Sequence, residues 1–321
     1  MSSNAKINKP VVICIFGPTG VGKTELLLSL NPEVYEVINA DSLQAYQKLS
    51  IGTAKPTIQE QQYIKHWGYD ILDPSEDYSV GKFIKITTEY IEDILRRHKI
   101  PVVSGGTAFY FKSLIEGAPS TPEIDNDIRK RVQKELGTLG SNTLYGILKQ
   151  VDPTSKVNSG DTYRITRALE IYYQTGIPQS LYKASRMPRP YEYRIIGLDR
   201  PRADLYQRIN KRVDIMFDKG LIQEIKNILK EGISYDAPAF KAIGYKEVLN
   251  AIDQGCICLE MIKNNIKQNS RQYAKRQLTF FRSLTGVKWC HPDNTLLIND
   301  LIGIDPFKGI SDNDGSIVEN R

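Results

Sequence analysis

A stretch near the N-terminus has the residue types and spacing of a phosphate-binding loop. It matches the pattern G-x-x-x-x-G-K-[ST] at every fixed position. Its glycines let the backbone curl so that successive N–H groups point inward, and Lys23 adds a full charge for phosphate oxygens. The Thr24 hydroxyl suits Mg²⁺, so we expect Mg²⁺ as cofactor and Thr24 as its protein ligand. The loop comprises Gly17, Pro18, Thr19, Gly20, Val21, Gly22, Lys23 and Thr24.

The residues around this loop must hold it in place, and they predict a strand before it and a helix after it. The apolar run 11–16 precedes the loop, and the helix-forming run 25–30 follows it. A tight glycine turn without a ligand is the alternative, but motif and context agree on a ligand site. Further strand-like runs cover residues 34–40, 68–72, 101–104, 193–199 and 287–290.

Helical patterns separate these strands, as in a helix predicted from Val80 to about Arg97 with Ser79 as its N-cap. The predicted fold class is α/β, with a P-loop NTPase-like, doubly wound parallel sheet and a small all-helical insertion domain. The insertion begins near Glu116, where glycine and prolines break the pattern. We expect a first part of the core at 1–115, the insertion at 116–190, a second part of the core at 191–290, and a tail at 291–321 that is disordered from about Asp305.

Two polar residues that follow strand-like runs are candidates for chemistry. Asp41 follows the run 34–40, and Thr107 follows two glycines at the end of the run 101–104. In an open α/β sheet ligands gather at the carboxyl ends of strands, so both side chains could face the loop's ligand. Each has a simpler alternative, which is to cap the start of a helix.

The composition is that of an ordinary globular protein of 321 residues, with 40% hydrophobic and 25% charged residues. The net charge of +6 permits an anionic partner without requiring one. Four cysteines and three scattered histidines suggest neither a disulfide framework nor a metal site. The sequence contains no signal-peptide pattern and no membrane span, so we expect a cytoplasmic protein.

A long helical stretch from about Cys258 to Leu284 carries charges of one sign. No acidic residue lies between Met261 and Thr285. Such a stripe is usually a solvated face, but the missing acids favour a polyanionic partner. The residues of the stripe recur every four positions: Lys263, Lys267, Arg271 and Lys275.

Taken together, these motifs resemble the tRNA dimethylallyltransferase (tRNA isopentenyltransferase) family from about Val11 to Leu284. A P-loop alone is shared by many activities, whereas this ordered set is specific. One departure is Lys241, where some members have an arginine with its bidentate fork. The stretches that carry the resemblance are Gly17–Thr24, Asn39–Tyr46, Ile51–Pro56, Gly105–Tyr110, Arg164–Glu170, Ala242–Tyr245 and Arg271–Gln277.

The resemblance implies transfer of a dimethylallyl group from dimethylallyl diphosphate to the exocyclic N6 of the adenosine just 3′ of the anticodon in tRNA. The P-loop would hold the diphosphate leaving group, with Mg²⁺ held through Thr24. The amine must lose a proton as the C–N bond forms, and Asp41 is the candidate base. Thr107 corresponds to the family's site threonine, and Lys23 and Arg212 would stabilise charge on the diphosphate.

The resemblance also implies binding of the anticodon stem-loop of tRNA, with the target base flipped into the site. The insertion would grip the anticodon arm, and the basic helix would contact phosphates in a salt-dependent manner. A monomer is the expected state. The residues that correspond to the family's tRNA contacts are Asp41, Ser42, Leu43, Gln44, Thr107, Arg129, Tyr163, Arg164, Ile165, Thr166, Arg167, Lys241, Ala242, Ile243, Gly244, Tyr245, Lys246, Ser270, Arg271, Gln272, Tyr273, Ala274, Lys275, Arg276 and Gln277.

Three other functions fit parts of the sequence. An adenylate isopentenyltransferase prenylates free nucleotide and needs neither the insertion nor the basic helix. An ATP-dependent kinase needs a clear Mg²⁺-binding aspartate after an apolar strand, and only Asp41 is near that description. A non-catalytic RNA-binding protein with a relic loop need not retain Lys23, Thr24 and Asp41.

Overall fold

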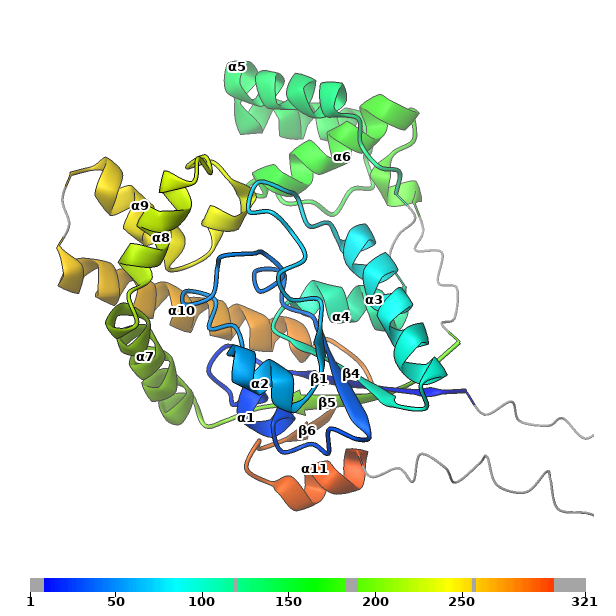
Figure 1. Cartoon of the computed structure of the whole chain (residues 1–321). Coiled ribbons are helices and arrows are strands. Elements are labelled where there is room, and N and C mark those ends of the chain that lie inside the picture. The colour runs from blue at the N-terminus through cyan, green and yellow to red at the C-terminus, as the bar shows by residue number, and fades with distance from the viewer. Residues whose placement is uncertain (1–8, 118–120, 183–189, 256–257, 303–321) are drawn as a thin grey trace, which may run out of the picture. The chain divides into compact units, whose positions relative to one another are not determined.

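Parallel strands form one sheet in the structure, a computed structural model that describes residues 9–117, 121–182, 190–255 and 258–302. The strands are β1 (Val11–Phe16), β2 (Tyr35–Asn39), β3 (His66–Trp67), β4 (Ile100–Gly105), β5 (Glu192–Leu198) and β6 (Lys288–Cys290). Their order across the sheet is β3-β2-β4-β1-β5-β6, and Figure 1 labels β1, β4, β5 and β6. The central strands are buried, which suits the continuous apolar runs of a parallel sheet covered on both faces. The predicted α/β class is confirmed.

One predicted strand is misplaced. Residues 68–72 do not form a strand, and β3 ends at Trp67. Gly68 has a φ of 80° and Asp70 a φ of 53°, and a strand cannot continue through such left-handed conformations. Leu72 instead forms an isolated parallel bridge with Tyr46.

The carboxyl ends of β1, β2 and β4 meet at one edge of the sheet, because β4 pairs in parallel with both neighbours up to their last residues. At this edge a Cβ on Gly105 would lie 2.2 Å from the carbonyl carbon of Ala40, so the position requires glycine. The P-loop, Asp41 and Thr107 follow these three strand ends directly. The fold therefore brings the candidate residues together although the sequence separates them.

Helices flank the sheet, and two of them show what the sequence predicted and what it missed. The N-cap Ser79 is confirmed, since its hydroxyl accepts the Lys82 N–H at 3.1 Å. The tail contains an unpredicted helix with buried Ile298, while the disorder expected from about Asp305 lies outside the described residues. The α-helices are α1 (Lys23–Leu27), α2 (Ile58–Tyr63), α3 (Val80–Arg96), α4 (Ala108–Glu116), α7 (Arg202–Asp218), α8 (Leu221–Lys230), α9 (Tyr245–Asp253), α10 (Leu259–Phe281) and α11 (Thr295–Ile302).

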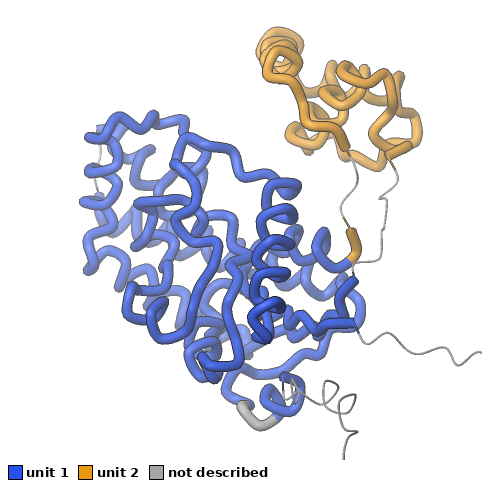
Figure 2. The backbone as a smooth tube through the Cα atoms, turned by 45° about the vertical axis from the view of Figure 1, so that its right-hand side comes forward, with its two compact units in different colours: residues 1–115, 190–321 blue, residues 116–189 orange. Residues whose placement is uncertain are grey.

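The chain divides into two compact units, which Figure 2 distinguishes by colour. Unit 1 combines residues 1–115 and 190–321, and unit 2 comprises residues 116–189. Unit 2 contains α5 (Asn126–Val151), α6 (Thr162–Thr175) and a short 3-10 helix. Its core consists of buried side chains from α5 and α6: Leu144, Leu148, Ile165, Ala168 and Leu169.

A buried clamp in unit 1 holds the loop at residues 50–52. The carboxylate of Glu224 on α8 accepts the N–H groups of this loop at 2.8–3.3 Å. The buried Tyr245 hydroxyl donates to the same carboxylate at 2.6 Å. A Cβ on Gly52 would lie 2.3 Å from the Tyr245 ring, so two motifs distant in the sequence form one contact.

Replacing Tyr245 by phenylalanine is expected to destabilise the protein by about 1 kcal/mol, because it removes the hydrogen bond to Glu224 while the other donors to Glu224 remain. Urea unfolding measures this change in free energy. Tyr235, which is 51% exposed, supplies the matched control Tyr235→Phe. Equal stability of the two variants would contradict the role given to the clamp.

Candidate active site

The P-loop has the predicted strand–loop–helix context and a backbone that its glycines make possible. Gly20 and Gly22 have φ values of 79° and 112°, in the left-handed region. Lys23 begins α1, and its Nζ donates to Gly17 O at 2.9 Å and to Pro18 O at 3.1 Å. Burial lowers the pKa of Lys23 to about 8, although the charge of Asp41 acts in the opposite direction. The loop thus holds a desolvated cation beside its own backbone.

Two arginines hold the P-loop from outside. Arg208 on α7 donates through Nε to Gly20 O at 2.9 Å and pairs with Glu25. Arg200 is 9% exposed and donates through Nε to Val21 O at 2.6 Å. Because these two loop carbonyls turn outward to the guanidinium groups, N–H groups of the loop remain to bind a ligand. Arg200 was not among the expected site residues, although it follows the end of β5 as closely as other site residues follow their strands.

Arg212, the arginine proposed from the sequence, lies near the loop's lysine and the candidate base. Burial lowers its pKa, and the charge of Asp41 partly offsets this effect. Its guanidinium donates to Thr53 O at 2.9 Å, which fixes the side chain from the other side. Asp41, Lys23 and Arg212 therefore interact electrostatically within one site.

Asp41 lies in a turn beyond β2, and no helix begins there. Its backbone N–H donates to the Asn39 side chain at 2.8 Å, and its Oδ1 accepts the Leu43 N–H at 3.1 Å. Its Oδ2 lies toward Gly106, where a Cβ would be 3.2 Å from that oxygen. The helix-cap alternative is thus replaced by a turn in which one carboxylate oxygen is held locally.

Thr107 connects the end of β4 to the turn that carries Asp41. Its hydroxyl accepts the Ser42 N–H at 3.0 Å and lies 3.3 Å from the Ser42 hydroxyl. Its own N–H donates to Ala40 O at 3.2 Å. The Thr107 hydroxyl is thus directed to the candidate base's turn, next to the start of α4.

Three tyrosines are close enough to Asp41 for its charge to act on them. Burial raises the pKa of Tyr69, Tyr110 and Tyr273, and the negative charge of Asp41 raises each of them further. These phenols stay protonated over the working range of most enzymes. Of the three, only Tyr273 was an expected site residue, because tyrosines scattered along a chain give no signal of a shared neighbour.

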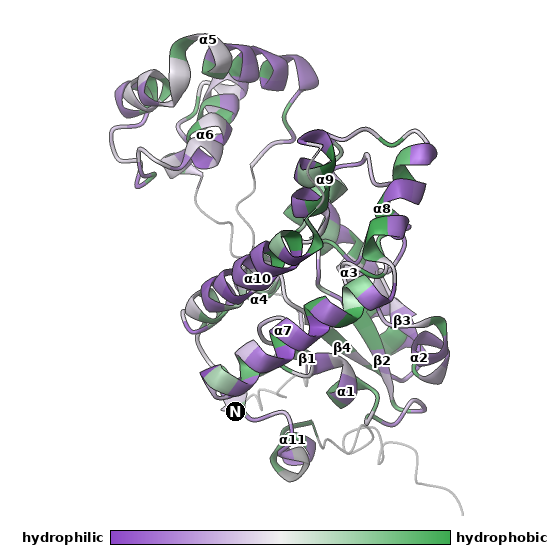
Figure 3. Cartoon of the chain, turned by 90° about the vertical axis from the view of Figure 1, so that its left-hand side faces the viewer, coloured by the Kyte–Doolittle hydropathy of each residue, from purple (hydrophilic) through white to green (hydrophobic). Residues whose placement is uncertain are grey.

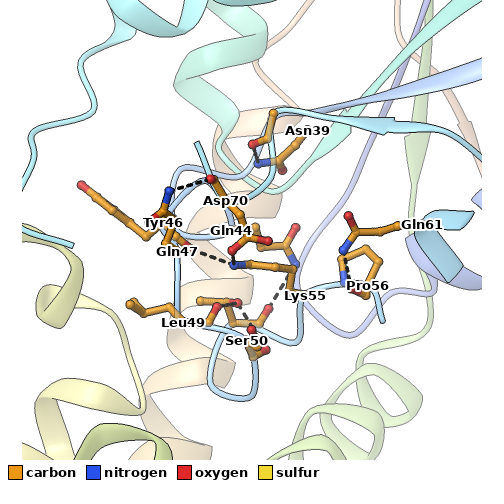
Figure 4. A network of polar contacts seen from close by, with 12 residues as sticks. Asn39, Gln44, Tyr46, Gln47, Leu49, Ser50, Lys55, Pro56, Gln61 and Asp70 are labelled. Carbon is orange, nitrogen blue, oxygen red and sulfur yellow. Dashed lines mark hydrogen bonds and ion pairs between the residues drawn. The ribbon is translucent and has the colours of Figure 1, made fainter. Parts of the chain in front are cut away.

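The loop at residues 44–56 is held by polar contacts (Figure 4). Gln44 donates through Nε2 to Thr53 O and Ala54 O, each at 3.1 Å. Lys55, whose side chain is 3% exposed, donates to Tyr46 O at 2.7 Å and pairs with Asp70 at 2.6 Å. The amide of Gln44, an expected tRNA contact, is therefore directed into its own loop.

The stripe of cations on α10 is largely used within the protein. Helices α7 and α10 lie side by side, and both carry many hydrophilic residues (Figure 3). Lys267 pairs with Asp214 at 2.6 Å, and Arg271 donates to Asn210 at 2.6 Å. Lys263 lies over the Phe217 ring. Helix α7 thus supplies partners for these three side chains, and binding of a polyanion by the stripe stays a prediction.

The remaining expected tRNA contacts divide by exposure. The buried residues are Ile165, Thr166, Ala242, Gly244, Tyr245, Ala274 and Gln277, and their expected contacts with tRNA stay predictions. Partly exposed are Asp41, Ser42, Leu43, Gln44, Thr107, Arg129, Arg167, Ile243, Ser270, Arg271 and Tyr273. Fully on the surface are Tyr163, Arg164, Lys241, Lys246, Gln272, Lys275 and Arg276.

The residues of the P-loop fit Mg²⁺ in the way that this ion prefers. Thr24 follows Lys23 in the first turn of α1 and is partly exposed. Within the described ranges no group of three or more His, Cys, Asp or Glu side chains could hold a metal. Mg²⁺ usually binds through few protein oxygens together with phosphate and water, and a single hydroxyl beside a phosphate-binding loop suits that habit.

Among the residues that the structure describes, no helix combines the length and apolarity needed to cross a membrane. Cys14, Cys258 and Cys290 are free thiols, and Cys256 lies outside the described residues.

Comparisons with known proteins agree on one family. The family model for IPP transferase matches residues 44–284, and that for isopentenyl transferase matches residues 10–67. The tRNA dimethylallyltransferase of Borrelia hermsii is 44% identical over 294 residues, covering 91% of this chain and 98% of that protein. That of Borreliella burgdorferi is 41% identical over 298 residues, covering 92% and 97%.

Solved structures lead to the same family. A tRNA delta(2)-isopentenylpyrophosphate transferase from Staphylococcus epidermidis has a TM-score of 0.66 and 38% identity, covering 92% of this chain and 98% of that one. A eukaryotic dimethylallyltransferase acting on tRNA has a TM-score of 0.75 and 30% identity, covering 92% and 77%. These matches extend along nearly the whole chain. This chain belongs to the IPP transferase family of tRNA dimethylallyltransferases.

Proposed function

We propose that this protein transfers a dimethylallyl group from dimethylallyl diphosphate to the exocyclic N6 of the adenosine 3′ to the anticodon in tRNA. The observation that carries the proposal is the pairing of a carboxylate with a phosphate-binding loop. Asp41 is close enough to Lys23 and Arg212 to shift their pKa values, and its Oδ2 lies beside Gly106. One site therefore offers a base and a diphosphate cradle.

The nucleophile needs help because the lone pair of an exocyclic adenine amine is delocalised into the ring. As the N6–carbon bond forms and the allylic C–O bond breaks, the amine proton passes to Asp41 and the electron pair leaves with the diphosphate. The turn at Asp41 keeps Oδ1 on the Leu43 N–H and leaves Oδ2 for the substrate. Thr107, bonded to Ser42, orients the same turn.

The leaving group acquires charge in the transition state, and the P-loop is suited to stabilise it. Lys23, the loop N–H groups and Arg212 are fixed before reaction, so little reorganisation is needed. When bound through Thr24, Mg²⁺ supplies further positive charge to the diphosphate oxygens.

Exposed cations on both units and an exposed aromatic ring on unit 2 recognise the tRNA. In unit 1 the exposed candidates are Lys241, Lys246 and Lys275, and in unit 2 they are Tyr163 and Arg164. Tyr163 is 78% exposed, which suits stacking on an unpaired base. A single chain holds both the catalytic base Asp41 and the P-loop, so the protein acts as a monomer. It acts in the cytoplasm, where tRNA is modified.

Single-turnover transfer tests the proposed function. The purified protein is incubated with labelled dimethylallyl diphosphate and Mg²⁺, with unmodified tRNA, AMP or ATP in separate reactions. Label in tRNA at the adenosine beside the anticodon is the expected result. Label in AMP alone would indicate an adenylate isopentenyltransferase, and hydrolysis of ATP without transfer would indicate a nucleotide-dependent enzyme.

Asp41→Asn is expected to slow transfer by about 100-fold to 10,000-fold, because it removes the proton acceptor while keeping the shape of the side chain. Binding of tRNA, measured by filter retention, is expected to stay within about threefold. The exposed Asp218 gives the control Asp218→Asn. Normal turnover in Asp41→Asn would refute the assignment of the base.

Affinity for pyrophosphate is expected to fall as the pH rises through about 8, because the pKa of Lys23 lies near that value and the ammonium form binds the anion. Lys23→Arg stays charged over the same range. Titration calorimetry measures the affinity of both proteins between about pH 6 and about pH 9. Because pyrophosphate titrates equally in both experiments, the ratio of the two affinities is free of that contribution. The ratio of the wild-type affinity to that of Lys23→Arg should fall above pH 8, and a constant ratio would contradict the prediction.

A further inference from the structure

A buried carboxamide on α10 joins two parts of the candidate active site. Gln277 is 4% exposed. Its Oε1 accepts the Thr19 N–H of the P-loop at 2.9 Å, and its Nε2 donates to Gly106 O at 2.8 Å. Exchanging the amide oxygen and nitrogen would set donor against donor, so the two bonds fix the orientation of the side chain.

The surroundings of Gln277 leave little room for a different arrangement. A Cβ on Gly106 would lie 2.6 Å from Gln277 Nε2 and 3.2 Å from Asp41 Oδ2. The amide and the candidate base thus approach the same glycine. Tyr273 lies one turn earlier on α10.

The two backbone partners of Gln277 belong to opposite sides of the proposed reaction. Thr19 lies in the loop that holds the leaving diphosphate, after β1. Gly106 precedes Thr107, which is bonded to the turn of the base, after β4. The two polar ends of this buried carboxamide are thus bonded to backbone atoms on the two sides of the site.

We infer that Gln277 is a positioning residue that sets the spacing between the diphosphate cradle and the base Asp41. This inference rests on the proposed function. Displacement at an allylic carbon needs the attacking nitrogen and the leaving oxygen held in alignment, and an error of about 1 Å costs about 100-fold in rate. Loss of the amide should therefore lower the rate at saturating substrate more than it weakens binding of either substrate.

Three variants test the inference. Gln277→Met keeps the length of the side chain and removes both hydrogen bonds. Gln277→Glu keeps an acceptor for the Thr19 N–H and, when ionised, loses the donor to Gly106 O. Gln268→Met makes the same change at an exposed position of α10 and is the control. Thermal unfolding of each variant establishes that it is folded at the assay temperature.

The measured quantities are the single-turnover rate at saturation, the KM for dimethylallyl diphosphate and the Kd for tRNA. We expect Gln277→Met to lose about 100-fold in rate, with KM and Kd within about threefold. Gln277→Glu should fall between Gln277→Met and wild type, and Gln268→Met should match wild type. A loss confined to KM, or a rate within about threefold of wild type, would overturn the inference.

Hydrogen exchange separates failure of the inference from failure of the proposed function. If wild-type protein transfers no label to tRNA, the proposed function fails. The positioning role of Gln277 is then judged only by how the backbone amides exchange. Faster exchange in the segments 17–24 and 105–107 of Gln277→Met than of Gln268→Met supports the positioning role of Gln277. Equal exchange in both variants refutes it.

Discussion

The close approach of β2 and β4 at their carboxyl ends constrains everything around the candidate site. The backbone of Gly105 lies so near Ala40 that no side chain fits between them. The turn with Asp41 and the turn with Thr107 therefore begin next to one another and share hydrogen bonds. Because β1 pairs with the other edge of β4, the P-loop joins the same group. A small shift of this strand pair would move the base relative to the phosphate-binding loop.

The charges at the site are balanced against the cost of removing them from water. Lys23 and Arg212 are both desolvated, and the carboxylate of Asp41 is an opposite charge that favours their charged forms. Arg200 and Arg208 are used differently, since they donate to carbonyls of the P-loop rather than point into it. The protein thus combines cations that face the proposed ligand with cations that shape its cradle.

The sequence predicts the parts of the site whose signals are local. The P-loop, the Ser79 cap and the α/β class follow from short patterns, since glycine turns, caps and apolar runs act over a few residues. The strand at 68–72 was wrong because single left-handed residues such as Asp70 leave no mark in a hydropathy pattern. The partners of the α10 cations, and those of Gln277, lie far away in the chain, so residue types alone cannot reveal them.

The position of unit 2 in the chain has a consequence for folding during synthesis. Strand β1 pairs with β4 on one side and with β5 on the other, and the insertion separates β4 from β5. The central strand therefore lacks one neighbour until the ribosome has passed unit 2, whose own contacts are closer in sequence. A nascent chain that has just completed unit 2 has all residues of the small domain, while β1 still lacks its partner β5. Until β5 has been synthesised, the apolar strand β1 is a target for chaperones that recognise such strands.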